Sequence, residues 1–180
     1  MENYINKMKH AGIEIEPGLT ADEFEKIEMI YGFTFPAELA EFYSCGVPSG
    51  DRFPNWKDFS EENVRAIKEK MAFPINALRG DVENWFWLDK WGDDPDTKEE
   101  ALAIFDEIAA RSPKMIPIFA HRYMPAFDGA PVISTVGRDT VYYGRDLAEY
   151  LQHEFLNIKW SPCKKKIKRI PLWSDVIEGN

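Results

Sequence analysis

The stretch that decides the fold is Met115 to Phe155, MIPIFAHRYMPAFDGAPVISTVGRDTVYYGRDLAEYLQHEF. Three strand-like runs follow one another in it, separated by short Gly, Pro and Asp punctuation: Met115 to His121, Pro131 to Val136 and Thr140 to Tyr143. Runs of this kind predict a β-meander. A helix is expected to begin at Asp146, whose carboxylate can cap free backbone N–H groups, and to lay an apolar stripe on the sheet. The stretch therefore predicts the core of an α+β domain.

The composition of the whole chain predicts one globular domain spanning residues 1–180. The chain has 44% hydrophobic and 14% aromatic residues, enough for a sizeable core. No apolar run is long enough for a transmembrane helix, and the first ten residues lack a signal-peptide region. Two cysteines, Cys45 and Cys163, are too few for a disulfide framework. These features indicate a cytoplasmic protein.

The charge is strongly negative and unevenly placed. The chain has 22 basic and 31 acidic residues, a formal net charge of −9. Residues 161–180 carry +3, because five basic residues outweigh Asp175 and Glu178, so the other 160 residues carry −12. A body this acidic repels nucleic-acid phosphate and attracts basic partners. Simple solubility is the alternative explanation for the same charge.

Start and stop signals predict further helices on both sides of the meander. The expected segments are Thr20 (capping box with Glu23) to Gly32, Pro36 to a left-handed cap at Gly46, Ser60 to Pro74, Asp96 or Thr97 to Ser112, and a last turn anchored by Trp173 and Ile177. Apolar stripes and strand runs predict as core residues Phe42, Tyr43, Phe105, Ile118, Val132, Leu147 and Tyr150.

An aromatic and acidic block lies between the third and fourth predicted helices. Trp85, Trp87 and Trp91 follow Trp56 within 36 residues, and the run WFWL predicts a strand that ends at Gly92 to Pro95. Core packing and an exposed stacking surface both fit these tryptophans. The acidic GDDPD loop argues against nucleic-acid stacking, which needs a positively charged groove.

The sequence has few signals of catalysis or metal binding. HExxH, CxxC, GxGxxG, GxxxxGK[ST] and GxSxG are all absent from the sequence. Asp93, Asp94 and Asp96 lack the spacing and the closing glutamate of a calcium loop. His121-Arg122 with Asp139 could form an active site, but we prefer a structural pair of Arg122 and Asp139 that joins strand ends. We expect no catalysis, no metal and no cofactor.

The order of the motifs adds a resemblance to a known family. The segments YGFTFPAELAEFY, FPNW, WFWLDKWG, IPIFAHRYMP and PVISTVGRDTVYYG follow one another as in the SUKH superfamily. This group of bacterial immunity proteins is related to the Smi/Knr regulators of fungal cell-wall assembly. The resemblance covers about residues 20–177 and implies helices packed around a mixed, largely antiparallel sheet. Two departures are Cys45-Gly46, where a glycine pair is common, and the basic tract Lys164 to Arg169.

The resemblance implies a non-enzymatic protein that neutralises a polymorphic toxin, often a nuclease, by binding it. The alternative is a cytoplasmic regulatory or scaffold protein of the Smi/Knr type without a toxin partner. A hydrolase using His121 and Asp139 is disfavoured. We expect a basic protein partner, and neither nucleic acid nor a membrane, and the leading candidates for the binding surface are Trp87, Trp91, Asp93, Asp94 and Asp96.

Overall fold

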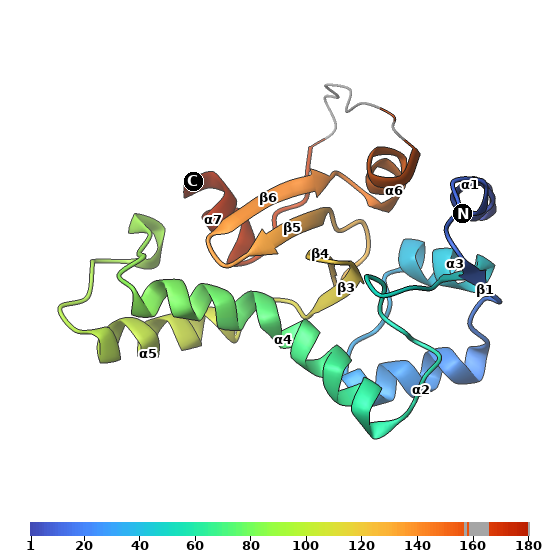
Figure 1. The fold of residues 1–180 in the computed structure, drawn as a ribbon. Helices are drawn as coiled ribbons and strands as arrows, with labels where there is room; N and C mark the ends of the chain where they lie inside the picture. Colours follow the sequence, from blue (N-terminus) through green and yellow to red (C-terminus); the bar gives the residue numbers. More distant parts are fainter. Residues whose placement is uncertain (157, 159–165, 180) are drawn as a thin grey trace.

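The computed structural model describes residues 1–156, 158 and 166–179 (Figure 1). The fold is α+β, as the meander and its flanking helices predicted. Along the chain the elements are α1 (Glu2–His10), β1 (Ile15–Glu16), α2 (Ala21–Tyr31), α3 (Ala37–Cys45), β2 (Val47–Pro48), α4 (Glu61–Glu83), the short 3₁₀ helix η1 (Asp89–Trp91), α5 (Lys98–Ala109), β3 (Met115–Phe119), β4 (Arg122–Pro125), β5 (Val132–Val136), β6 (Asp139–Gly144), α6 (Leu147–Leu156) and α7 (Trp173–Gly179). None of the helices formed by the described residues has both the length and the apolar character needed to span a membrane.

The central sheet is an antiparallel meander of four strands, in the order β3-β4-β5-β6. The sequence predicted three, and β4 was missed. The turn between β3 and β4 uses Ala120 in a left-handed conformation, with φ 48°. No glycine or proline therefore marks the turn, and the sequence pattern predicts a single run that continues to His121. A smaller antiparallel sheet pairs β1 with β2.

Both faces of the meander are covered, and two apolar clusters result. Ile116, Met124 and Val132 face a cluster built with α1, α2, α3 and α6. Tyr123 and Ile133 face the second cluster, which includes residues of α4, α5 and α7. All seven predicted core residues are at most 2% exposed, which confirms that prediction: Phe42, Tyr43, Phe105, Ile118, Val132, Leu147 and Tyr150.

Most of the predicted helix caps form. Thr20 and Glu23 make the reciprocal bonds of a capping box, and Gly32 ends α2 in the left-handed conformation, with φ 66°. The expected left-handed cap at Gly46 is wrong, because its φ of 164° is extended backbone. Glycine is required there for space: a Cβ would lie 2.6 Å from the Ile15 side chain. Thr97, and not Asp96, caps α5 by accepting the Glu100 N–H at 3.2 Å.

The third predicted helix does not stop at Pro74 but continues to Glu83. A proline inside a helix leaves the carbonyl four residues earlier without its usual N–H partner. Here that carbonyl belongs to Lys70, and it accepts a hydrogen bond from the Tyr123 hydroxyl at 3.1 Å. Pro74 is itself buried. Tertiary structure thus replaces the lost helical bond, and α4 can run from one apolar cluster into the other.

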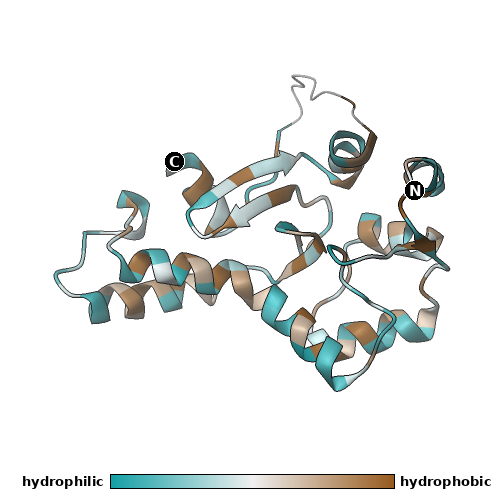
Figure 2. Ribbon diagram, viewed as in Figure 1, coloured by the Kyte–Doolittle hydropathy of each residue, from teal (hydrophilic) through white to brown (hydrophobic). Residues whose placement is uncertain are grey.

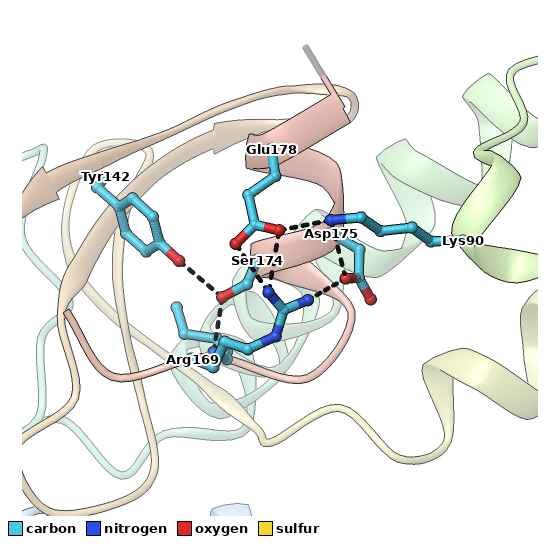
Figure 3. A network of polar contacts seen from close by, with 7 residues as sticks. Lys90, Tyr142, Arg169, Ser174, Asp175 and Glu178 are labelled. Atoms are coloured by element: carbon cyan, nitrogen blue, oxygen red, sulfur yellow. Dashed lines mark hydrogen bonds and ion pairs between the residues drawn. The ribbon is translucent and has the colours of Figure 1, made fainter. Parts of the chain in front are cut away.

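The C-terminal helix is held by a polar network (Figure 3). Arg169 pairs with Asp175 and Glu178, and Lys90 of η1 pairs with Glu178. Beneath them, the Ser174 hydroxyl contacts the Tyr142 hydroxyl at 2.7 Å and accepts the Ile170 N–H at 2.8 Å. Arg169, the last residue of the predicted basic tract, is therefore part of this network, whereas Lys164 and Lys165 lie outside the described residues, as does Cys163.

Candidate functional site

The candidate surface lies where α4 ends and the chain turns back into α5. These two helices pack side by side and project away from the sheet (Figure 1). The predicted WFWL strand is wrong, because Trp85 and Phe86 belong to the C-terminal cap of α4. The Trp85 N–H donates to Val82 and the Phe86 N–H donates to Asp81, both at 3.0 Å. This pattern is a Schellman motif, which satisfies the last carbonyls of a helix.

Trp85 occupies the left-handed position of that motif, with φ 67°. Glycine is the usual residue there. The Trp85 side chain is 58% exposed, which is unusual for a ring of this size. Lys98, the first residue of α5, lies with its ammonium 5.8 Å from the centre of the ring. Trp85 therefore stands on the surface between the end of α4 and the start of α5.

The two tryptophans expected at the binding surface are placed differently. Trp91 is only 9% exposed, so the expectation that it forms part of an exposed surface is wrong. Its ring packs on Phe86, Trp87 and Phe105 at centroid distances of 5.4 to 5.8 Å. Trp87 is partly buried and donates its indole N–H to the Gly92 carbonyl at 3.1 Å. Both rings support the loop, and Trp85 is the exposed one.

The predicted carboxylates do lie together on the surface. Asp93, Asp94 and Asp96 are all exposed in the loop before α5. Figure 2 colours this loop and the first turn of α5 as mainly hydrophilic. The exposed acidic residues around Trp85 are Glu83, Asp89, Asp93, Asp94, Asp96, Glu99 and Glu100. We call these residues and Trp85 the acidic tip.

The acidic tip holds much of the charge of the chain. Residues 81–100 include eight acidic and two basic residues, a net charge of −6 out of −9 for the whole chain. One of the two basic residues, Lys90, is paired with Glu178 and Asp175 of α7. The other, Lys98, lies over Trp85. The carboxylates of the tip therefore face solvent with little local compensation.

Sequence reasoning missed Trp85 because it assigned the wrong local structure. In a strand, the side chains of Trp85 and Trp87 would lie on the same face of the sheet. A strand therefore predicts the same exposure for both rings. The spacing of Leu78 and Val82 is a signal that α4 continues past Pro74. It does not predict the exposure of Trp85, because positions 78, 82 and 85 share one helical face; the exposure follows from the left-handed turn at Trp85.

The predicted pair of Arg122 and Asp139 does not form. The Arg122 Nε lies 3.4 Å from a carboxylate oxygen of Glu154, and the guanidinium stacks on the Tyr143 ring at 4.0 Å. Asp139 is exposed at the start of β6, opposite Val136. The register explains the error, because Arg122 pairs with Ser134 in the middle of β5, away from the hairpin turn that carries Asp139.

The His121 ring contacts the Arg122 guanidinium. Burial and the neighbouring Arg122 charge lower the pKa of His121 below its usual 6.5. In the described part of the chain, no hydrogen bond joins His121 to Asp139. Across the same residues, no group of three or more His, Cys, Asp or Glu side chains is placed to hold a metal ion.

Comparison with known proteins gives no significant match. The chain matches no protein-family model, and neither a curated protein nor a solved structure is significantly similar to it.

Proposed function

We propose that this chain is a non-enzymatic binding protein of the SUKH type, which neutralises a basic, nuclease-type toxin by direct contact. The observation that carries the proposal is the acidic tip: a charge of −6 within residues 81–100, placed around an exposed tryptophan. The order of sequence motifs that resembles the SUKH superfamily supports it independently.

The two components of the tip have different roles in binding. Tryptophan gives a large contact area at a low cost in side-chain entropy and is enriched among the residues that dominate binding energy. Exposed carboxylates steer an oppositely charged partner toward the surface and mainly raise the rate of association. Trp85 is therefore the anchor, and Asp93, Asp94 and Asp96 accelerate the encounter.

An acidic surface suits an inhibitor of a nuclease for a simple reason. A protein that acts on nucleic acid needs positive charge to hold the phosphates. A negatively charged surface is attracted to the same positive charges and can block access to the nucleic-acid site. The inhibitor then needs no catalytic residue of its own.

A survival assay in bacteria tests the proposal. Cells would express the toxin domain encoded beside this chain, together with the wild-type chain or with a variant. We expect wild type to restore growth and the triple variant Asp93→Asn, Asp94→Asn, Asp96→Asn to protect less, with Trp85→Ala protecting least. The matched control is Glu14→Gln, Glu25→Gln, Glu69→Gln, which removes the same charge from exposed positions outside the tip.

The outcome also separates the alternatives. Full protection by every variant would move the interface away from the tip while keeping the immunity role. No protection by wild type, or the absence of any adjacent toxin gene, would favour the regulatory or scaffold protein of the Smi/Knr type.

A further inference from the structure

A second feature of the surface is an apolar groove where α2, α4 and α5 meet. Its volume is about 510 Å³, within the range of small-molecule sites. The lining includes Met29, Met71, Ile75 and Met115, together with Lys68 and Lys114. We call it the methionine groove. Met29 is 80% exposed on its rim, an unusual position for a large apolar side chain.

The two lysines give the groove a positive charge in an acidic protein. Lys114 donates to the Tyr31 carbonyl at 2.9 Å, and an ammonium has two further N–H groups. Lys68 makes no ion pair or hydrogen bond with any residue that the structure describes. Its neighbours one helical turn away are Val64, Arg65, Met71 and Ala72, none of them acidic. Both ammonium groups are therefore available to a carboxylate.

We propose that the methionine groove binds an amphipathic carboxylate with an unbranched apolar chain, such as a medium-chain fatty acid. Methionine side chains are flexible and polarisable, so they adapt to an apolar chain without a fixed shape. The lysines supply charge-assisted hydrogen bonds to the carboxylate. The site is separate from the acidic tip: Met71 and Glu83 are twelve residues apart on α4, about 18 Å along the helix.

Methyl NMR of the full-length protein, labelled with ¹³C at the methionine methyl groups, tests the proposal with decanoate as the probe. The six methionines supply their own controls, because Met29, Met71 and Met115 line the groove whereas Met1, Met8 and Met124 do not. We expect decanoate to shift the three groove signals along one saturable curve. The other three signals should stay within experimental error.

Charge-matched probes and variants then test the role of the lysines. Decyltrimethylammonium has the same apolar chain with the opposite charge, and we expect it to shift the groove signals weakly. Lys68→Gln with Lys114→Gln should weaken decanoate binding about tenfold or more, since two charge-assisted contacts are lost. Lys7→Gln, at an exposed position on α1, is the control. Unchanged thermal unfolding of the double variant would show that its loss of binding is not a loss of folding.

Two results would overturn the proposal. Absence of saturable shifts at the groove methionines would show that decanoate does not bind there. Equal shifts with decanoate, decanol and the ammonium probe would show a non-selective apolar surface, open to a protein partner. Either result would leave the proposed function of the acidic tip unaffected, because the survival assay does not depend on the groove.

Discussion

Trp85 combines an unfavourable backbone with an exposed ring. The left-handed conformation costs a residue with a Cβ about 1–2 kcal/mol. Little of this cost is returned by packing, since 58% of the side chain faces solvent. Strained residues that persist in a structure are concentrated at sites of binding and catalysis. The proposed role in partner binding would account for tryptophan at a position where glycine would be more stable.

Trp85→Gly should therefore separate stability from binding. We expect the free energy of unfolding in urea to stay constant or rise by up to about 1 kcal/mol, as the strain is removed. Toxin affinity should fall by tenfold or more, since the aromatic anchor is lost. Trp85→Phe keeps both a ring and the strain, so it should retain most of the binding. Destabilisation by more than about 2 kcal/mol would instead make Trp85 a structural residue.

Arg122 allows a paired test of the corrected contact. Glu154 is its carboxylate partner, and the exposed fractions of the two side chains are 12% for Arg122 and 17% for Glu154. Glu154→Gln should lower the free energy of unfolding by about 3 kcal/mol, because a largely buried guanidinium loses its counter-charge. Asp139→Asn, at an exposed position, should change it by less than about 0.5 kcal/mol. If Asp139→Asn lowered the thermal stability more than Glu154→Gln, the result would support the pair of Arg122 and Asp139 predicted from the sequence.

Among the secondary-structure elements, the sequence predicted the boundaries that are marked by capping residues or turn glycines. The Thr20 capping box, the end of α2 at Gly32 and the glycine turn before β6 were all visible in the sequence. The boundaries of β4 and α4 were not. Ala120 turns the chain without a glycine, and Pro74 is tolerated because Tyr123, 49 residues away, supplies a hydrogen bond. Such partners from distant parts of the chain cannot be read from a local pattern.

Within α4, Gly80 has no visible packing role. A Cβ at this position would meet no atom within 4 Å. Gly80→Ala should raise the free energy of unfolding by about 0.4–1 kcal/mol, because alanine is the better helix former. Gly18→Ala is the contrasting variant, since its Cβ would lie 2.0 Å from the Ser44 carbonyl oxygen and should destabilise the protein. Denaturant unfolding of both variants compares them directly; a destabilising Gly80→Ala would reveal a contact absent from this structure.

At the start of α6, Glu149 should make stability depend on pH. Its carboxylate bonds the Arg145 guanidinium and accepts the Arg145 N–H at 2.7 Å, which lowers the pKa of Glu149 below its ordinary 4.5. A lowered pKa gives stability that is present above the unfolded value and lost as the pH falls through the folded one. Glu149→Gln should cost about 1–3 kcal/mol at pH 7, and the difference from wild type should shrink below pH 4.5. A difference that does not change with pH would contradict this assignment.

For the molecule as a whole, the uneven charge predicts how a basic partner associates. Exposed charges are screened beyond about 8 Å at physiological ionic strength. Stopped-flow association with a purified toxin domain should therefore slow as salt rises, while dissociation changes little. The Asp93, Asp94 and Asp96 triple variant should flatten this salt dependence, and the Glu14, Glu25 and Glu69 variant should do so less. Equal effects of the two variants would assign the steering to net charge and not to the tip.

Helix α4 bends along its length (Figure 1), and it contains Pro74, a type of residue that kinks helices. The ten residues from Pro74 to Glu83 form a helical segment about 15 Å long that begins at the proline. A change of about 10° at this point would move the far end by about 2.6 Å. Two contacts on the tip side of the proline resist such a movement: the Arg138 N–H bond to Asp81 and the ion pair of Lys90 with Glu178. The acidic tip is therefore oriented before its partner binds, and Glu178→Gln, which removes the ion pair with Lys90, should weaken partner binding although Glu178 lies outside the contact surface.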